Sequence, residues 1–209
     1  MLVCTAFVFV SNTTIGQLHA DFTSTPQSGC PPVVVTFSDQ STGSPTAWKW
    51  DLGNGTISFL KNPIATYFNP GTYNVKLVIS NSSGKDSIIK NQFITVFSLP
   101  TIAFTASDSM GCFPLKVNFT DNSIANSGTI TNWQWDFGDG NLSNAQNPQH
   151  TYTGAGTYTV ILRVVNSNGC SKVITKPAMI KTLNGVKAGF NYSSVQGCNK
   201  WQLDFSEMK

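Results

Sequence analysis

Hydrophobic and polar residues alternate along short stretches of the chain, and this alternation predicts β-strands. Val33, Val35 and Phe37 alternate with polar or smaller residues, and the same period recurs at residues 115–119 and 73–79. Side chains two residues apart lie on one face of a strand, so each stretch predicts a strand with one buried face. Clusters of Gly, Pro, Asn and Asp separate the stretches and mark turns. No stretch has helical periodicity.

The chain is an internal repeat. Residues 48–84 align with residues 133–169 without a gap, at an offset of 85, and upstream the offset falls to 82, where "GCPPVVVTFSD" matches "GCFPLKVNFTD". A partial copy begins near residue 188 with "AGFNYSSVQGC". A period of this length is that of a small domain, longer than a solenoid repeat. The predicted organisation is a leader at 1–18, a first domain at 19–98, a second domain at 100–183 and the start of a third copy at 186–209.

About seven short strands fit into each copy of some 80 residues. This spacing predicts an all-β fold in which each copy is an immunoglobulin-like β-sandwich. Tyr73 and Tyr158 stand early in the penultimate strand of their copies, within "GTY", and suit a tyrosine corner.

An apolar run at residues 2–10 begins the chain. It is too short to span a bilayer but fits the hydrophobic region of a secretory signal peptide, although the usual positive residues before it are missing. The alternative is a buried first strand. No later segment is long and apolar enough to cross a membrane, so the sequence predicts a secreted or cell-surface protein without a membrane span in its mature form.

Charge is sparse along the whole chain. Only 11% of residues are charged and the formal net charge is +3. Globular domains typically have about 25% charged residues. Since no run of Lys and Arg is present either, the electrostatic footprint of a nucleic-acid-binding protein is absent.

The stretches "WKWDLGNG" (48–55) and "WQWDFGDG" (133–140) hold the most conspicuous carboxylates. Asp139 of the second copy corresponds to Asn54 of the first. Asp and Asn are nearly equivalent in a tight turn before glycine, but an amide cannot act as a general acid or base. Asp51 and Asp136 occur in both copies, directly after a tryptophan, and are expected to accept hydrogen bonds from backbone or hydroxyl donors. The repeat therefore favours turn chemistry over catalysis.

The four tryptophans of these stretches have two interpretations. Trp50 and Trp135 are expected in the sandwich core, and Trp48 and Trp133 lie on the same face of the pleat. The second pair either packs at the sandwich edge or stacks against a sugar ring. Of the two histidines, His150 corresponds to an alanine, so no repeated chemistry depends on it, and no catalytic triad, phosphate loop or zinc-binding motif is present.

Five cysteines are present. Cys30, Cys112 and Cys198 occupy the same place in the three copies, and Cys170 is found only in the second. Because only the second copy has two cysteines, a Cys112–Cys170 disulfide is expected, provided that the chain is secreted. Cys30 is expected to be buried and inert, with intermolecular pairing as the alternative, and Cys198 to pair beyond the chain.

The second copy, "WQWDFGDG" followed by "NPQHTYTGAGTYTVILRVVNSNG", resembles the PKD (polycystic kidney disease) domain. The first copy departs from that signature at Leu52, Asn54 and Ala65. The resemblance implies an extracellular β-sandwich used as a spacer or binding module. It also implies calcium as a candidate ligand, although Asp39 and Asp121 are too generic to define a site. The residues assigned to the structural motif are Trp50, Asp51, Gly53, Gly55, Tyr73, Trp135, Asp136, Gly138, Asp139, Gly140 and Tyr158.

The sequence thus predicts no catalytic residue, no cofactor and no metal site. It favours a non-catalytic repeat segment of a larger adhesion-type protein, with an extracellular protein or polysaccharide as partner. The alternative is an accessory carbohydrate- or protein-binding module of a secreted hydrolase.

Overall fold

The computed structural model of the protein describes residues 16–185 and divides the chain into two units at Val96–Phe97. The predicted third copy, with Cys198, and all but the end of the predicted leader, with Cys4, lie outside the described residues. Within the described part every regular element is a strand, and no helix that could span a membrane occurs there. The all-β prediction is confirmed.

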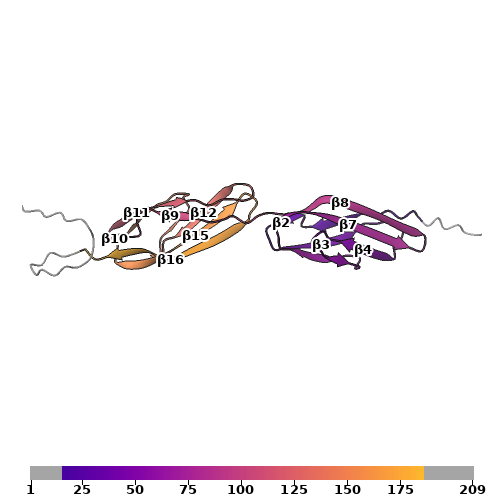
Figure 1. The fold of residues 1–209 in the computed structure, drawn as a ribbon, viewed down its shortest axis with the longest axis horizontal. Coiled ribbons are helices and arrows are strands. Elements are labelled where there is room, and N and C mark those ends of the chain that lie inside the picture. The colour runs from indigo at the N-terminus through magenta and orange to yellow at the C-terminus, as the bar shows by residue number, and fades with distance from the viewer. Residues whose placement is uncertain (1–15, 186–209) are drawn as a thin grey trace, which may run out of the picture. The chain divides into compact units, whose positions relative to one another are not determined.

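Each unit contains two sheets, one of three strands and one of five (Figure 1). In the first unit the three-stranded sheet has the order β1-β3-β6 and the five-stranded sheet the order β2-β8-β7-β4-β5. All neighbouring strands are antiparallel except β2 and β8. The strands are β1 (Phe22–Thr25), β2 (Ser28–Gly29), β3 (Val33–Asp39), β4 (Ala47–Asp51), β5 (Ile57–Ser58), β6 (Ile64–Tyr67), β7 (Gly71–Asn81) and β8 (Gly84–Val96).

The second unit repeats this topology with the sheets β14-β11-β9 and β10-β16-β15-β12-β13. Its strands are β9 (Phe104–Ala106), β10 (Met110–Cys112), β11 (Leu115–Asp121), β12 (Ile130–Asp136), β13 (Leu142–Ser143), β14 (Gln149–Tyr152), β15 (Gly156–Asn166) and β16 (Ser171–Leu183). The two copies have therefore kept one fold despite their differences in sequence.

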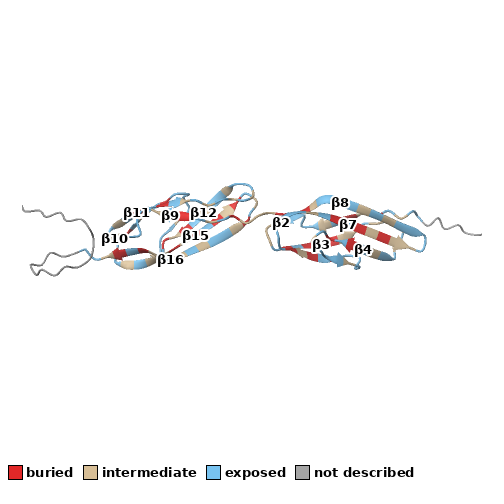
Figure 2. Cartoon of the chain, viewed as in Figure 1, coloured by how far each residue is buried: buried red, intermediate tan, exposed pale blue. Residues whose placement is uncertain are grey.

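Buried residues alternate with more exposed ones along the central strands, as the sequence pattern predicts, and the buried positions are coloured red in Figure 2. Trp50 is completely buried at the centre of the first core, and Phe22 meets it edge-on with ring centroids 5.1 Å apart. Trp135 and Phe104 repeat this pair at 5.0 Å. Edge-on aromatic pairs contribute about 0.5–1.5 kcal/mol beyond the burial of their area.

A β-bulge interrupts the pairing of β7 with β8 between Tyr73 and Val75. The hydroxyl of Tyr73 donates a hydrogen bond to the carbonyl oxygen of Asn69 over 2.6 Å, and Tyr158 donates to Gly154 over 2.9 Å. This bond from a tyrosine to the backbone four residues upstream is that of a tyrosine corner.

The expected Cys112–Cys170 disulfide is wrong, because the strand register separates the two residues. Cys112 pairs with Leu183 at the end of β16, whereas Cys170 directly precedes its first residue. The 13 residues of β16 span roughly 40 Å at about 3.3 Å per residue. A disulfide needs Cα atoms within about 7 Å.

Cys30, Cys112 and Cys170 are each disulfide-bonded. The expectation that Cys30 is buried and inert is therefore also wrong: the residue is half-buried and oxidised. Membership of one repeat does not imply proximity, because the two cysteines of the second repeat lie at opposite ends of one long strand.

Candidate functional site

The turn after β4 and its counterpart after β12 are held by side chains that accept backbone hydrogen bonds. In the first unit, Asp51 Oδ1 accepts from the Gly53 amide over 3.0 Å, and Asn54 Oδ1 accepts from the Thr56 amide over the same distance. An acceptor that binds the amide two residues ahead forms an Asx turn. The carboxylate of Asp51 therefore shapes the backbone.

The second unit makes the same two bonds. Asp136 Oδ1 accepts from Gly138 over 2.9 Å, and Asp139 Oδ1 accepts from Asn141 over 3.1 Å. The amide of Asn54 and the carboxylate of Asp139 thus have the same role in their turns. That role requires neither proton transfer nor a negative charge.

Positive φ angles in these turns fall on the glycines and not on the Asx residues between them. Gly53 has φ +77° and Gly138 has φ +80°. A Cβ atom on Gly138 would lie 2.4 Å from the carbonyl oxygen of Thr159, and one on Gly53 would lie 2.2 Å from that of Asn74. These glycines allow the turn to approach the bulge in the neighbouring strand.

Each of the four tryptophans within residues 16–185 has a partner for its indole N–H inside its own unit. Trp50 Nε1 donates to the Leu60 carbonyl over 2.9 Å, which suits a core residue with one polar atom. Trp48 is half-buried against the core, its Nε1 donates to Asp39 Oδ2 over 2.9 Å, and Lys61 Nζ lies 5.6 Å from the centroid of its ring.

The second unit repeats these indole bonds. Trp135 Nε1 donates to Ala145 over 2.9 Å, and Trp133 Nε1 donates to Asp121 Oδ2 over 2.7 Å. Sequence reasoning missed the bond between the outer tryptophan and the aspartate. The signal was present, since Asp39 and Asp121 recur in both copies together with that tryptophan.

His150 and Asp139 form a contact found only in the second unit. Their Nε2 and Oδ2 atoms lie 2.7 Å apart, with side chains 12% and 15% exposed. The imidazole lies flat on Phe137, with ring centroids 4.3 Å apart and planes 5° apart, and Tyr152 meets it edge-on. Burial acts to raise the pKa of Asp139, but hydrogen bonds from His150 and Asn141 outweigh it and hold that pKa below its ordinary value of 3.8.

The first unit has Asn54 and Ala65 at these two positions. There the Asn54 amide donates to the Thr66 carbonyl over 3.1 Å. The neighbouring Tyr67 and Tyr152 hydroxyls each donate to a turn carbonyl, of Leu52 and Phe137. Burial raises the pKa of both tyrosines, so they remain protonated donors.

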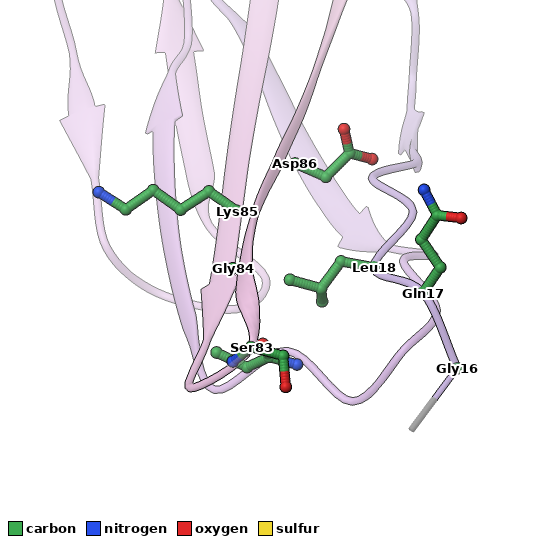
Figure 3. A pocket seen from close by; sticks show the side chains of 8 residues that line it. Gly16, Gln17, Leu18, Ser83, Gly84, Lys85 and Asp86 are labelled. Carbon is green, nitrogen blue, oxygen red and sulfur yellow. The ribbon is translucent and has the colours of Figure 1, made fainter. Parts of the chain in front are cut away.

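Two hollows open on the surface of the first unit. One of about 210 Å³ lies between the segment Gly16–Leu18 and the β7–β8 turn, where Leu18 points toward the turn (Figure 3). The other, of about 650 Å³, runs beside Asp51, Tyr73 and Lys76. Asp51 is exposed there, with Oδ1 bound to the Gly53 amide, so it is not a desolvated acid or base.

No group of three or more His, Cys, Asp or Glu side chains that could hold a metal ion occurs among residues 16–185. Asp39 and Asp121, the generic calcium ligands of the sequence, each give one carboxylate oxygen to an indole N–H and the other to a serine amide. These bonds describe two structural carboxylates.

The outer face of the three-stranded sheet differs between the units. Val34 on β3 and Ile64 on β6 are 57% and 63% exposed, and Phe68, directly after β6, is 69% exposed. The pairing of Val34 with Thr66 and of Thr36 with Ile64 places Val34 and Ile64 on one face. We call Val34, Ile64 and Phe68 the apolar face.

The equivalent positions of the second unit are Lys116, Gln149 and Thr153. Single exposed apolar residues are normal on a protein surface, but a group of three that is polar in the sister repeat is specific to the first unit.

Residues 18–96 and 98–182 match the family model of the PKD domain. The chain is 36% identical over 87 residues to a microbial collagenase of Vibrio alginolyticus, covering 41% of this chain and 11% of that protein. It is 29% identical to polycystin-1 of Homo sapiens (65% and 3% covered) and 27% identical to the pre-pro-metalloprotease PrtV of Vibrio cholerae (66% and 15%). The chain thus spans only a small part of these relatives.

Among solved structures, the PKD1 domain of the Vibrio cholerae metalloprotease PrtV is 30% identical, with a TM-score of 0.37, and the match covers 41% of this chain and all of that domain. The PKD1 domain of Vibrio anguillarum Epp is 29% identical with the same TM-score, covering 42% of this chain and 99% of that domain.

Proposed function

The chain belongs to the PKD domain family, and we propose that it is a non-catalytic extracellular spacer and protein-interaction segment of a longer protein. One observation supports this most directly: in both repeats the motif carboxylates accept backbone amide bonds in turns. Groups committed in this way shape the loop and do not take part in proton transfer.

The His150–Asp139 pair does not alter this proposal. It is absent from the first unit, where Asn54 and Ala65 stand instead, and its imidazole lies flat on Phe137 with Tyr152 edge-on to it. A histidine–carboxylate pair is catalytic only when its base reaches a nucleophile or a substrate proton. Here the pair links the turn to strand β14.

The apolar face of the first unit is the surface that we assign to partner binding. Val34, Ile64 and Phe68 offer aliphatic and aromatic area without a carboxylate or amide among them. Sugar binding relies on polar groups together with an aromatic platform, whereas protein interfaces have apolar centres. The face therefore favours a protein partner.

A second candidate is an accessory module of a secreted hydrolase, and the names of the relatives favour it: two collagenases and a metalloprotease are among the matching proteins. In that case the bound partner is the hydrolase's own substrate. Trp48 and Trp133 are the residues proposed to stack on a glycan, and their half-buried rings leave part of each indole exposed.

Affinity electrophoresis separates these functions. Gels containing gelatin, native collagen or one of a panel of polysaccharides are run with the wild-type protein and with the triple variant Val34→Lys, Ile64→Gln and Phe68→Thr. These substitutions copy the second unit, so they should leave the fold intact. We expect retardation in a protein-containing gel that the triple variant loses.

The control is a Trp133→Ala variant. Retardation in a polysaccharide gel that Trp133→Ala removes and the triple variant keeps would contradict the protein-interaction proposal and support glycan binding. Clearing of gelatin by the protein itself in a zymogram would contradict the non-catalytic assignment.

A further inference from the structure

We propose that the larger hollow of the first unit binds a neutral oligosaccharide. This hollow of about 650 Å³ lies on the exposed face of the five-stranded sheet and is lined by residues of β4, β7 and β8. Its volume is within the range of about 300–1,000 Å³ that small-molecule sites occupy. The apolar face belongs to the other sheet of the unit, so the proposed sugar site does not depend on the protein-binding proposal.

One row of side chains crosses the sheet within the hollow. The register places Asp51 of β4 opposite Lys76 of β7, and Lys76 opposite Ile89 of β8. All three residues are exposed and line the hollow. Because neighbouring strands lie about 4.8 Å apart, the row spans about 10 Å across the sheet. The hollow thus offers an acceptor, a donor and an apolar side chain in one line.

The β-bulge of β7 adds amide groups beside this row. Asn74 lies in the bulge, and its Oδ1 accepts a hydrogen bond from the Gln92 amide over 2.7 Å. That bond fixes the side chain through its oxygen, so the Nδ2 group can donate to a ligand. Asn91 precedes Gln92, is exposed and also lines the hollow.

The carboxylate and the aromatic ring of the hollow are fixed as well. Asp51 Oδ1 accepts from the Gly53 amide over 3.0 Å, which orients the carboxylate and leaves Oδ2 as an acceptor for a ligand. Tyr73 is half-buried, and its hydroxyl is bound to the Asn69 carbonyl over 2.6 Å. Groups that are already ordered lose little conformational entropy when a ligand binds.

The chemistry of these groups fits a hydroxyl-rich ligand without charge. A sugar hydroxyl both donates and accepts, which matches a carboxylate oxygen beside amide and ammonium donors, and the C–H groups of a sugar ring suit Tyr73 and Ile89. The one carboxylate and the one ammonium group of the lining balance each other, so a charged ligand is not favoured. The hollow lies on paired strands and not at a sheet edge, so a peptide cannot bind there by adding a strand.

The second unit replaces part of this lining. The residues that stand in place of Asn74, Lys76 and Ile89 are Thr159, Ile161 and Thr175. The hydroxyl of Thr159 still accepts from the backbone amide of the bulge, at Ala178 over 3.4 Å. The replacements therefore keep the backbone arrangement but remove the amide and ammonium donors, and they provide matched substitutions for a test.

Titration of the isotope-labelled full chain tests the site by NMR. The probes are cellopentaose, maltopentaose and acetylated chitopentaose, which are neutral and differ in linkage or substitution. We expect at least one probe to shift the backbone amide signals of β7 and β8 around Asn74 and Asn91. The variant Asn74→Thr, Lys76→Ile and Ile89→Thr should bind that probe about tenfold more weakly or worse, because it lacks two donors. Its own amide spectrum shows whether it is folded.

Asp51→Asn is a sharper single change. An amide oxygen can still accept the Gly53 hydrogen bond, so urea unfolding should be unchanged, whereas the ligand loses a charged acceptor and should bind more weakly. The triple variant of the apolar face and the Trp133→Ala variant should both bind the probe as the wild type does.

Failure of every probe to shift these signals would overturn the proposal, and so would equal affinity in the wild type and the Asn74→Thr, Lys76→Ile, Ile89→Thr variant. Loss of binding in Trp133→Ala would locate the sugar elsewhere and would equally overturn it. Signals shifted by a gelatin peptide but by no oligosaccharide would assign the hollow to a peptide ligand instead. These outcomes leave the protein-binding proposal unaffected, because the hollow and the apolar face share no residue.

Discussion

Removal of the His150 imidazole tests whether the His150–Asp139 pair has a structural role. In the His150→Ala variant the Asp139 carboxylate loses its 2.7 Å partner, and Phe137 loses the ring stacked on it. A hydrogen bond to a charged group contributes about 1.5–3 kcal/mol, and an aromatic contact about 0.5–1.5 kcal/mol. Because both side chains are more than four-fifths buried, we expect a loss of about 2–4 kcal/mol in the second unit.

The first repeat provides the compensating change. There Asn54 donates from its amide to the Thr66 carbonyl, beside Ala65. Adding Asp139→Asn to His150→Ala copies this arrangement and removes the unpaired carboxylate. The double variant should therefore be more stable than His150→Ala alone, by about 1–2 kcal/mol, which is a typical coupling energy between contacting residues.

The pair also predicts a dependence on pH. The pKa of Asp139 is lowered in the folded state, so its contribution to stability is present above the unfolded value of 3.8 and is lost as the pH falls through the folded value. At a pH below the folded-state pKa of Asp139, the second unit of the wild type should have lost this contribution. The Asp139→Asn variant cannot lose it, because the amide does not titrate.

Hydrogen exchange measured by mass spectrometry reports the units separately, through peptides from β7 and β15. We expect faster exchange in β15 of the His150→Ala variant and unchanged exchange in β7. A loss below about 0.5 kcal/mol, or a double variant as unstable as the sum of its single changes, would refute the structural role.

Two further substitutions test the turns and the outer tryptophan by urea unfolding. Gly138→Ala should lower the free energy of unfolding by about 3 kcal/mol or more, because the added Cβ would meet the Thr159 carbonyl oxygen at 2.4 Å. Gly140 has a similar φ but nothing within 4 Å of its Cβ position, so Gly140→Ala should lower it by only about 1–2 kcal/mol. Equal losses in the two variants would contradict the close-approach argument. Asp121→Ala should lower the free energy of unfolding by about 1–3 kcal/mol and shift the indole fluorescence to longer wavelength, because Trp133 Nε1 loses its acceptor. Asp121→Asn should lower stability less. An unchanged spectrum in the alanine variant would contradict this bond.

The comparison of the two repeats explains why the strands and the turn residues could be predicted from the sequence alone. Alternation at Val33, Val35 and Phe37 depends only on neighbours along the chain, and these three residues are buried or nearly so, as expected. The correspondence of Asp139 with Asn54 between the repeats indicates a turn acceptor, and each residue does accept an amide hydrogen bond.

Contacts across the sandwich could not be read in this way. The absence of His150 from the first repeat argues against repeated chemistry at this position, yet the residue lies on Phe137 and against Asp139. The sequence allows two interpretations of Trp133, because its partner, Asp121, stands on a strand of the other sheet.

The cysteines show the difference between what the sequence determines and what only the tertiary structure determines. The sequence by itself determined the strands, the repeat and the equivalence of its members, because these follow from local periodicity and internal comparison. Only the tertiary structure decided which side chains meet, since register places Cys112 and Cys170 at opposite ends of β16 although they belong to one repeat. Proximity within a sandwich is a property of strand pairing, and a sequence of alternating residues is compatible with more than one pairing.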